Sequence, residues 1–411
     1  MTSDDGSEQQ PVAEQTQSLP VNRNAISTTE KSKVDGHHHE DLPPPNGGLV
    51  AWTQVTGAFF LFFNTWGIVN TFGVYQTYYQ LDMLASESSS NIAWIGSFQG
   101  FLLFLGSAVT GPFFDMGYLR MLLSLGFGML FLLSVAIVSQ YFSTKRAFAF
   151  GIAASGSSLG GVFYTLIFRA LQPRVGFGWA TRIIAFIMLV TLVIPVLGMK
   201  LRGESSTTRR DFLDLTAFKA KPYLAFCLSD FFGFMSIYVT FFYIQLYAEE
   251  QVSISSLLAS YLLTITNAAS TIGRLIPNFF ADKIGPLIIL IPFALVVTVL
   301  CFGWIGITSE AGIVVFCFLY GFFCGAFVSL PGIIVITISP NLKTIGIQLG
   351  MALSISGFGM LIGEPIAGAI LDANSGWKGL QAFCGAMILL SGAFALLARL
   401  YRTGPILMAK A

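Results

Sequence analysis

Long apolar runs alternate with short polar segments along most of the 411-residue chain. A bilayer core needs about 20 apolar residues per helix, and a single segment in lipid satisfies its backbone only as a helix. The pattern therefore predicts an all-α polytopic membrane protein. Eleven runs qualify: Val50–Tyr79, Ile92–Phe114, Met121–Val138, Ala147–Phe168, Trp179–Met199, Tyr223–Tyr247, Ser256–Phe280, Leu287–Ile307, Ile313–Ile338, Ile345–Leu371 and Leu380–Tyr401.

The N-terminal segment, residues 1–46, has a different character. It is rich in Ser, Gln, Glu, Thr and Pro, and it lacks the apolar stretch of a signal peptide. We expect a disordered cytosolic tail. The three histidines of the chain, His37, His38 and His39, all lie in it, and we assign no metal site to them.

Basic residues are placed unevenly between the runs, which predicts an orientation. Residues 200–221 hold six of them, whereas Leu81–Ser90, Glu249–Ser255 and Thr308–Gly312 hold none. Short loops rich in Lys and Arg face the cytosol. We therefore expect a cytosolic linker at 200–221 between helical bundles at 47–199 and 222–402, with a cytosolic tail at 403–411.

Composition narrows the function classes. Only 10% of the residues are charged and the net charge is +1, so no basic surface for nucleic acid is expected. The five cysteines lie inside apolar runs and show no metal-ligand spacing. With no histidine in any run and no phosphate-binding Gly-x-x-x-x-Gly-Lys-Ser/Thr motif, an intramembrane hydrolase and an ATP-driven pump are disfavoured. No cofactor is expected.

Two echoes suggest an internal duplication. The segment from Gly111 to Gly117 resembles the one from Asn278 to Gly285, with Asp115 and Asp282 167 residues apart. The small-residue stretch from Gly151 to Gly160 resembles the one from Gly350 to Gly359, at an offset of 199. The offsets differ by 32 residues, close to one helix plus a turn. About 11 spans are thus detected where 12 are expected, and the first half is the short one.

The shortfall raises a question about the third run, Met121–Val138. If it crosses the membrane, Lys145 and Arg146 emerge on the non-cytosolic side, against the charge bias. If it is re-entrant, we expect the small-residue surface Ser155–Gly161 to face lipid. We interpret the chain as lacking a segment here.

The two aspartate loops resemble the cytosolic signature of the major facilitator superfamily, Gly-x-x-x-Asp-Arg-x-Gly-x-Arg. The resemblance implies a secondary transporter built from two pseudo-repeated bundles. It also implies a conformational latch, in which each aspartate bonds the start of a neighbouring helix and a basic partner. Asp115 and Arg120 would form it in one half, Asp282 and Lys283 in the other. Met116 and Asn278 depart from the pattern.

Further stretches resemble the fungal form of the monocarboxylate-porter branch. The entry motif, Asn46-Gly47-Gly48 before Trp52, has Asn where that branch has an acid, and the segment around Asn64 also matches. Arg274 matches the branch's substrate-site arginine. Ser270 stands where an aspartate is usual, and the first run carries no lysine, so the coupling ion stays open.

Apart from Arg399 near the end of the last run, four charged side chains fall inside predicted spans: Arg182, Asp230, Arg274 and Glu364. A charge at mid-membrane costs about 3 kcal/mol on insertion scales, so each is a functional candidate. Arg182 suits a snorkelling helix end. We take Arg274, Glu364, Asp230 and Asn64 as substrate-binding candidates, with structural pairing as the alternative. Glu364-Pro365 is expected to break its helix.

The function expected from this sequence is secondary active efflux of a fungal secondary metabolite. Uptake of a monocarboxylate or vitamin is the first alternative, and a shortened, transport-impaired product or sensor is the second. The expected partners are a small organic substrate and the lipid bilayer. The expected location is the plasma membrane, with the N-terminus in the cytosol.

Overall fold

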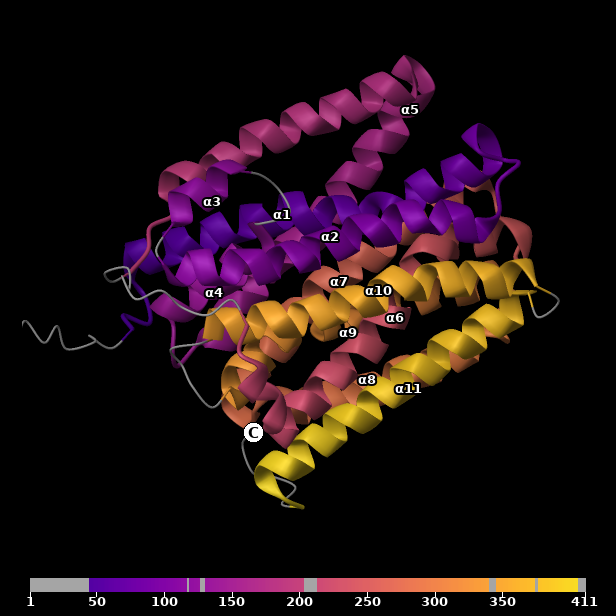
Figure 1. Cartoon of the computed structure of the whole chain (residues 1–411). Coiled ribbons are helices and arrows are strands. Elements are labelled where there is room, and N and C mark those ends of the chain that lie inside the picture. Colours follow the sequence, from indigo (N-terminus) through magenta and orange to yellow (C-terminus); the bar gives the residue numbers. More distant parts are fainter. Residues whose placement is uncertain are drawn as a thin grey trace, which may run out of the picture. The chain divides into compact units, whose positions relative to one another are not determined.

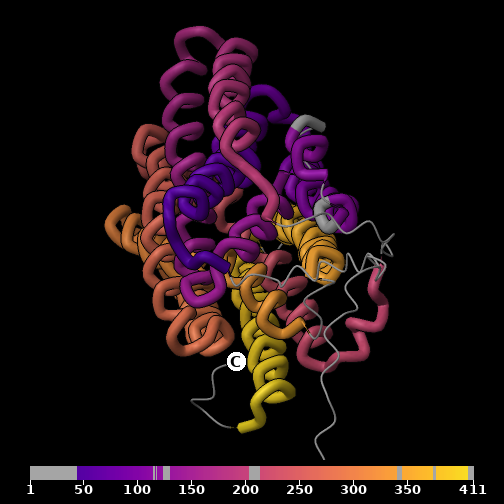
Figure 2. The backbone as a smooth tube through the Cα atoms, turned by 90° about the vertical axis from the view of Figure 1, so that its left-hand side faces the viewer, coloured from indigo at the N-terminus to yellow at the C-terminus, as the bar shows by residue number. Residues whose placement is uncertain are grey.

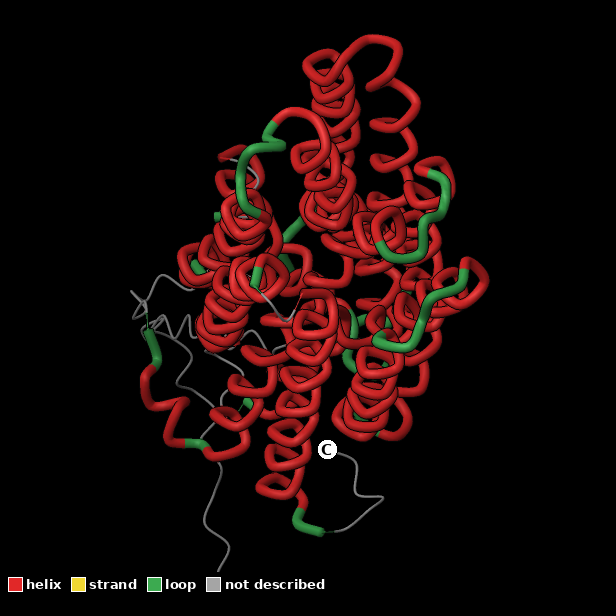
Figure 3. Tube along the Cα trace, turned by 90° about the vertical axis from the view of Figure 1, so that its right-hand side faces the viewer, coloured by secondary structure: helices red, strands yellow, loops and turns green. Residues whose placement is uncertain are grey.

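The computed structural model describes residues 44–116, 118–125, 130–202, 213–339, 345–373 and 376–405, apart from the side chains of Phe114, Asp115, Ser124 and Leu125. The regular elements in these ranges are all helical (Figures 1 and 3). They are α1 (Gly48–Tyr78), the π-helix η1 (Tyr79–Met83), α2 (Ser89–Asp115), α3 (Leu119–Leu125), α4 (Leu130–Tyr141), α5 (Arg146–Gly198), the 3-10 helix η3 (Leu215–Lys219), α6 (Lys221–Glu250), α7 (Ser256–Ile284), α8 (Pro286–Trp304), α9 (Glu310–Ile338), α10 (Ile345–Asp372) and α11 (Gly376–Thr403). Residues 1–43, with the three histidines, lie outside the described part.

Eight of the described helices are long and apolar enough to cross a membrane. α5 is one of these eight helices, but it consists of two helical segments that meet at Gly176, where φ is 76°. Glycine adopts this left-handed φ without steric cost, so the chain turns back there (Figure 2). α7 is also long, at 29 residues. The predicted all-α membrane class is confirmed.

The third expected run is not a span, which corrects the sequence interpretation. It divides into α3 and α4, and both outer ends lie at the end of the protein where α5 finishes, which we call the linker end. Arg120 of α3 lines the same cavity as Lys200, and the Tyr141 hydroxyl of α4 donates to the Lys200 carbonyl at 2.9 Å. The run is therefore re-entrant. Lys145 and Arg146 stay on the same side as the linker.

We expected the surface Ser155–Gly161 to face lipid if the third run is re-entrant, and this expectation is wrong. All of its residues except Leu159 are buried. A Cβ on Gly160 would stand 2.9 Å from the Cα of Gly67, so the small residues let α1 pack directly on α5. The exposed apolar faces lie elsewhere, on α2 around Phe98 and on the second segment of α5 around Val190.

The repeat seen in the sequence has a geometric counterpart. Helix α10 of the second half packs along α2 of the first, and α5 of the first half packs along α7 of the second (Figure 1). A Cβ on Gly350 would stand 2.9 Å from the Ser107 carbonyl of α2. One on Gly151 would stand 2.6 Å from the Arg274 carbonyl of α7. The two echoing stretches thus serve matching contacts between the halves.

Candidate functional site

An aromatic cluster occupies the middle of the helices. The ring of Trp66 on α1 stacks on that of Tyr238 on α6, with centroids 5.4 Å apart. Phe104, Phe131 and Phe234 surround Trp66 at 4.9 to 6.2 Å. Phe131 comes from α4, so the re-entrant helix reaches this depth and contributes to the cluster. Trp66 and Tyr238 are fully buried. The Trp66 indole N–H has no hydrogen-bond partner in the described part of the chain, whereas the Tyr238 hydroxyl interacts with Arg274.

Arg274 lies beside this cluster on α7 and is 1% exposed. Its Nη1 donates to the Ala154 carbonyl at 3.0 Å and to the Ser157 hydroxyl, and its Nε donates to Ser270 Oγ at 3.3 Å. All three partners are neutral. No carboxylate forms an ion pair with Arg274 within the described ranges. A buried cation held only by neutral acceptors is costly, so this charge is poised to receive an anion.

Glu364, on α10, is a second ionisable group near Tyr238. Tyr238 is within electrostatic range of both Arg274 and Glu364. Glu364 is fully buried, and neither of its carboxyl oxygens has a hydrogen-bond partner among the described residues. A lone carboxylate in an apolar interior is strongly disfavoured, whereas a protonated carboxyl is tolerated there. The arrangement places a cation and a proton-binding group within electrostatic range of one tyrosine.

The helix around Glu364 is not broken as we expected. α10 continues through Pro365 to Asp372, and Pro365 lies inside it. The Ser90 hydroxyl, at the start of α2, donates to the Pro365 carbonyl at 3.0 Å. Packing between α2 and α10 thus supports the helix across the proline.

Asp230 and Asn64 lie apart from Arg274 and Glu364. Asp230 accepts a hydrogen bond from Ser356 Oγ at 3.1 Å and so links α6 to α10. Asn64 Oδ1 accepts from the Tyr164 hydroxyl at 2.8 Å and from Thr191 Oγ1 at 3.0 Å. Asn64 therefore joins α1 to both segments of α5. The other carboxylate oxygen of Asp230, Oδ1, has no partner among the described residues. The substrate-binding role of both residues stays a prediction.

Asp282 stands where the second latch was expected, at the linker end. Its two carboxylate oxygens accept hydrogen bonds from the backbone N–H groups of Ala147 and Phe148, both at 2.9 Å. These groups belong to the first turn of α5, which favours a negative charge. The nearby cation is Arg146, within electrostatic range of Asp282. Lys283, the basic partner predicted from the sequence, lies over the Phe279 ring at 4.3 Å.

The first latch is described only in part, because the side chain of Asp115 lies outside the described residues. Its helix is close to the expected partner. A Cβ on Gly111 of α2 would stand 2.7 Å from the Gly346 carbonyl in the first turn of α10. Arg120, on α3, lines a cavity with Lys200. In the second half, Asp282 of α7 contacts the first turn of α5. In both halves, the helix that carries the aspartate therefore lies against the start of a helix from the other half.

Two polar contacts fasten the linker end. Asn46 Oδ1 accepts hydrogen bonds from the backbone N–H groups of Ser143 and Thr144, at 2.7 and 2.9 Å. The neutral amide thus accepts the hydrogen bonds that an acidic side chain at this position could accept. After the linker, the Gln348 side chain donates to Asp214 at 2.9 Å. Hydrogen bonds from Thr216 and Gln348 hold the pKa of Asp214 below its ordinary value.

A cavity of about 390 Å³ opens at the opposite end, between α1, α5, α6 and α7. Asp82, Arg169 and Glu249 are its charged lining residues. Arg169 lies over the Tyr261 ring, 3.7 Å from the centroid. The hydrogen bonds of Asp282 to α5 thus lie at the linker end. The cavity with charged lining residues, which we call the charged vestibule, lies at the far end.

Sequence reasoning missed Tyr238, Trp66 and Arg146 as members of these sites. Trp66 lies in a stretch that resembled the fungal branch, and Arg146 was noted only for its charge. Tyr238 carried no signal, because it lies in an aromatic run and acquires its place only through the packing of α6.

Comparisons with known proteins agree with this architecture. Residues 93–341 match the Major Facilitator Superfamily. The MFS-type transporter dbaD of Emericella nidulans is 40% identical over 380 residues, covering 84% of this chain and 85% of its own. The aspyridones efflux protein apdF of the same fungus is 37% identical, covering 90% and 82%.

Solved structures give the same fold. The human organic anion transporter MFSD10 superposes with a TM-score of 0.65 at 13% identity, over 85% of this chain and all of its own. The outward conformation of the transporter FucP gives a TM-score of 0.52 at 16% identity, over 85% and 99%. The monocarboxylate-porter branch stays a prediction. The family match and the similarity to curated relatives show that the chain belongs to the major facilitator superfamily of transporters.

Proposed function

We propose that this chain exports an acidic fungal secondary metabolite across the plasma membrane, with Arg274 as the residue that recognises its anionic group. One relative supports the cargo class, since it is named as an efflux protein for aspyridones. The observation that carries the proposal is the buried Arg274 guanidinium, whose partners are all neutral. A planar guanidinium binds a carboxylate or enolate through two parallel hydrogen bonds.

The surroundings of Arg274 suit a partly aromatic cargo. Trp66 and Tyr238 supply stacked aromatic rings, and the Trp66 indole N–H has no partner among the described residues. Buried polar atoms in native proteins are normally satisfied, so such atoms fit groups that a ligand or water would fill. We assign the acidic group of the cargo to Arg274 and its ring system to the Trp66–Tyr238 pair.

Glu364 is our candidate for the coupling proton. Its carboxyl has no fixed partner within the described ranges and lies near Tyr238, which also neighbours Arg274. An anionic cargo at Arg274 and a charge at Glu364 would influence each other across the tyrosine. Alternating protonation of Glu364 with occupancy of Arg274 would link a proton gradient to export.

The contacts at the two ends suit one stage of an alternating-access cycle. Asp282 holds the start of α5 at the linker end, and the charged vestibule lies at the other. We assign the linker end and the N-terminus to the cytosol from the charge pattern. In this state, cargo would leave through the vestibule past Arg169.

The test is an export assay with the full chain in yeast vesicles. Aspyridones and benzoate serve as probes, and movement is measured in both directions with and without a pH gradient. Gradient-dependent export of aspyridones is the expected result. Benzoate uptake without aspyridone export would favour the monocarboxylate alternative. No movement of either probe, with the protein folded and in the membrane, would favour the transport-impaired alternative.

A further inference from the structure

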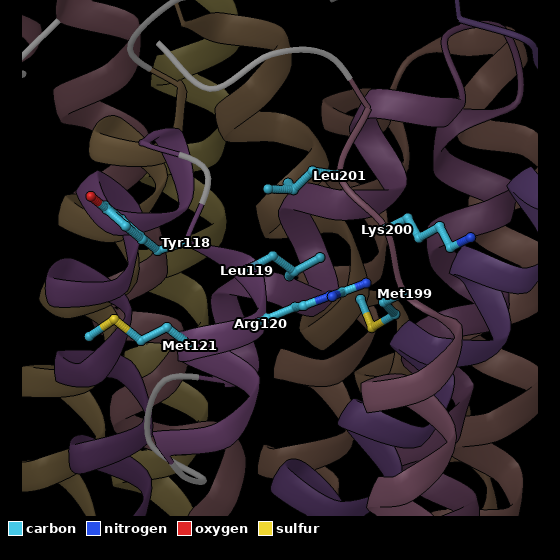
Figure 4. A pocket seen from close by; sticks show the side chains of 7 residues that line it. All are labelled: Tyr118, Leu119, Arg120, Met121, Met199, Lys200 and Leu201. Carbon is cyan, nitrogen blue, oxygen red and sulfur yellow. The ribbon is translucent and has the colours of Figure 1, made fainter. Parts of the chain in front are cut away.

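A cavity of about 350 Å³ lies at the linker end, outside the proposed transport site. Seven residues line it: Tyr118, Leu119, Arg120, Met121, Met199, Lys200 and Leu201. We call it the basic cavity, because its charged lining residues are Arg120 and Lys200. Figure 4 shows Arg120 extending from α3 across the space towards Met199. Both basic side chains are exposed.

The remaining lining residues are apolar or amphipathic, with two methionines, two leucines and a tyrosine. A cavity built for a free inorganic anion would be expected to surround it with polar donors. Here the basic groups occur together with an apolar wall at a helix end, which is the composition of an interfacial site for a lipid headgroup. Tyrosine at the same level suits the membrane interface.

A separate apolar groove lies along the second segment of α5, on the N-terminal side of the residues that line the basic cavity. It has a volume of about 300 Å³ and is lined by Ile183, Phe186, Ile187, Val190 and Thr191. At 1.5 Å per residue, the groove lies about 10 to 22 Å from Gly198, the end of α5. Half of a bilayer core is about 15 Å thick, so an acyl chain from a headgroup in the basic cavity would reach it.

The surface between the two features is also apolar. Val193 and Leu197 are exposed on the side of α5 between the groove and the basic cavity. α3 is only 7 residues long, about 10 Å, and cannot cover this face to the depth of the groove. The face therefore has room for a ligand of lipid length and is charged at only one end.

We infer that the basic cavity and the α5 groove together bind one anionic glycerophospholipid, with its phosphate at Arg120 and Lys200 and one acyl chain along Val190. The inference does not depend on the identity of the cargo. Each cation near an anionic headgroup counts for about fivefold in binding. The two together should give roughly twenty-fivefold preference for an anionic over a zwitterionic lipid.

The experiment uses the purified full chain in detergent, titrated with phosphatidylserine, phosphatidylcholine or inorganic phosphate. Bound lipid is counted by native mass spectrometry and the thermal midpoint is followed. Phosphatidylserine should bind about twenty-fivefold better than phosphatidylcholine. The double variant Arg120→Gln/Lys200→Gln should lose most of that preference. The matched control Lys219→Gln/Lys221→Gln, which removes two cations near the same end, should keep it.

Equal binding of the two lipids would overturn the inference. So would an equal loss of preference in the control, which would indicate diffuse surface charge. Stabilisation by phosphate that matches phosphatidylserine would indicate a site for small anions instead. If the double variant does not fold, the unmodified chain is photolabelled with phosphatidylserine that carries a reactive acyl chain. Label should then appear within residues 183–197, and label confined to other segments would contradict the proposed site.

Discussion

The carboxylate of Asp282 accepts a hydrogen bond from the backbone N–H of Ala147 at 2.9 Å, joining the last turn of α7 to the first turn of α5. A second bond of the same length reaches Phe148. Asp282 and Ala147 are 135 positions apart in the sequence, and their contact joins the two halves of the protein at the linker end. The negative charge lies where α5 presents unbonded N–H groups, and Arg146 lies nearby.

Replacing Asp282 by Ala should loosen the linker end. Loss of a helix cap costs about 1–2 kcal/mol, which corresponds to roughly a fivefold to thirtyfold shift towards the open state. A cysteine placed at Ser155, which is buried on α5, should then react correspondingly faster with a thiol reagent applied from the linker side. Lys283→Gln is the control, because Lys283 contacts only the Phe279 ring among the contacts described. Unchanged labelling in Asp282→Ala would show that the contact does not limit opening.

Arg274→Lys should impair transport without unfolding the protein. Lysine keeps the charge but loses the planar fork that pairs with a carboxylate. A charge-assisted hydrogen bond contributes about 1.5–3 kcal/mol, so export at low cargo concentration should fall roughly tenfold or more. The measurement is the initial rate against cargo concentration, corrected for surface expression. Arg182→Lys provides a control that lies over Trp179 near the opposite end. Equal rates for both variants and the parent chain would assign Arg274 to packing.

Glu364→Gln should separate stability from coupling. Glutamine has nearly the shape of a protonated carboxyl, and Glu364 has no partner to lose among the described residues. We expect a thermal midpoint close to that of the parent chain and export that no longer responds to a pH gradient. Asp230→Asn changes the carboxyl that Ser356 already bonds, and it should retain the response. A normal gradient response in Glu364→Gln would remove Glu364 from the coupling step.

The charge pattern predicts the orientation of the linker. An epitope inserted at Ser205 should bind antibody only after the plasma membrane is permeabilised. The control epitope sits at Ser86, in a loop that carries no basic residue and should be reached from outside intact cells. The reverse pattern of labelling would invert the assignment of both ends.

The short first half also makes a prediction. Inserting a two-span segment from a full-length relative after Leu125 should cover the exposed faces of α2 and α5, because helices in lipid associate through such packing surfaces. Folded yield, thermal midpoint and export should rise together. If the 411-residue chain already matches the lengthened one in all three measurements, neither folding nor transport requires the additional segment.

The local sequence was sufficient to predict the helices and to identify the residues whose charge is costly inside a membrane. Apolar runs longer than a bilayer core have only one way to satisfy their backbone, so the helical class and most spans followed directly. Arg274 and Glu364 stood out because a charge inside a span requires a reason. The capping position of Asp282 followed from a motif at a helix end. None of these conclusions needed knowledge of the neighbours.

Only the tertiary structure decided what each of these groups touches. The run Met121–Val138 is just long enough to cross a membrane, so its length could not distinguish a span from a re-entrant pair. Burial of α4 against α1 decided it. Packing also decided that Asn64 hydrogen-bonds Tyr164 and Thr191. Tyr238 comes within electrostatic range of Arg274 and Glu364 only through the packing of α6. Apolar runs encode insertion into lipid, whereas the rotation and depth of each helix depend on contacts between segments distant in the chain.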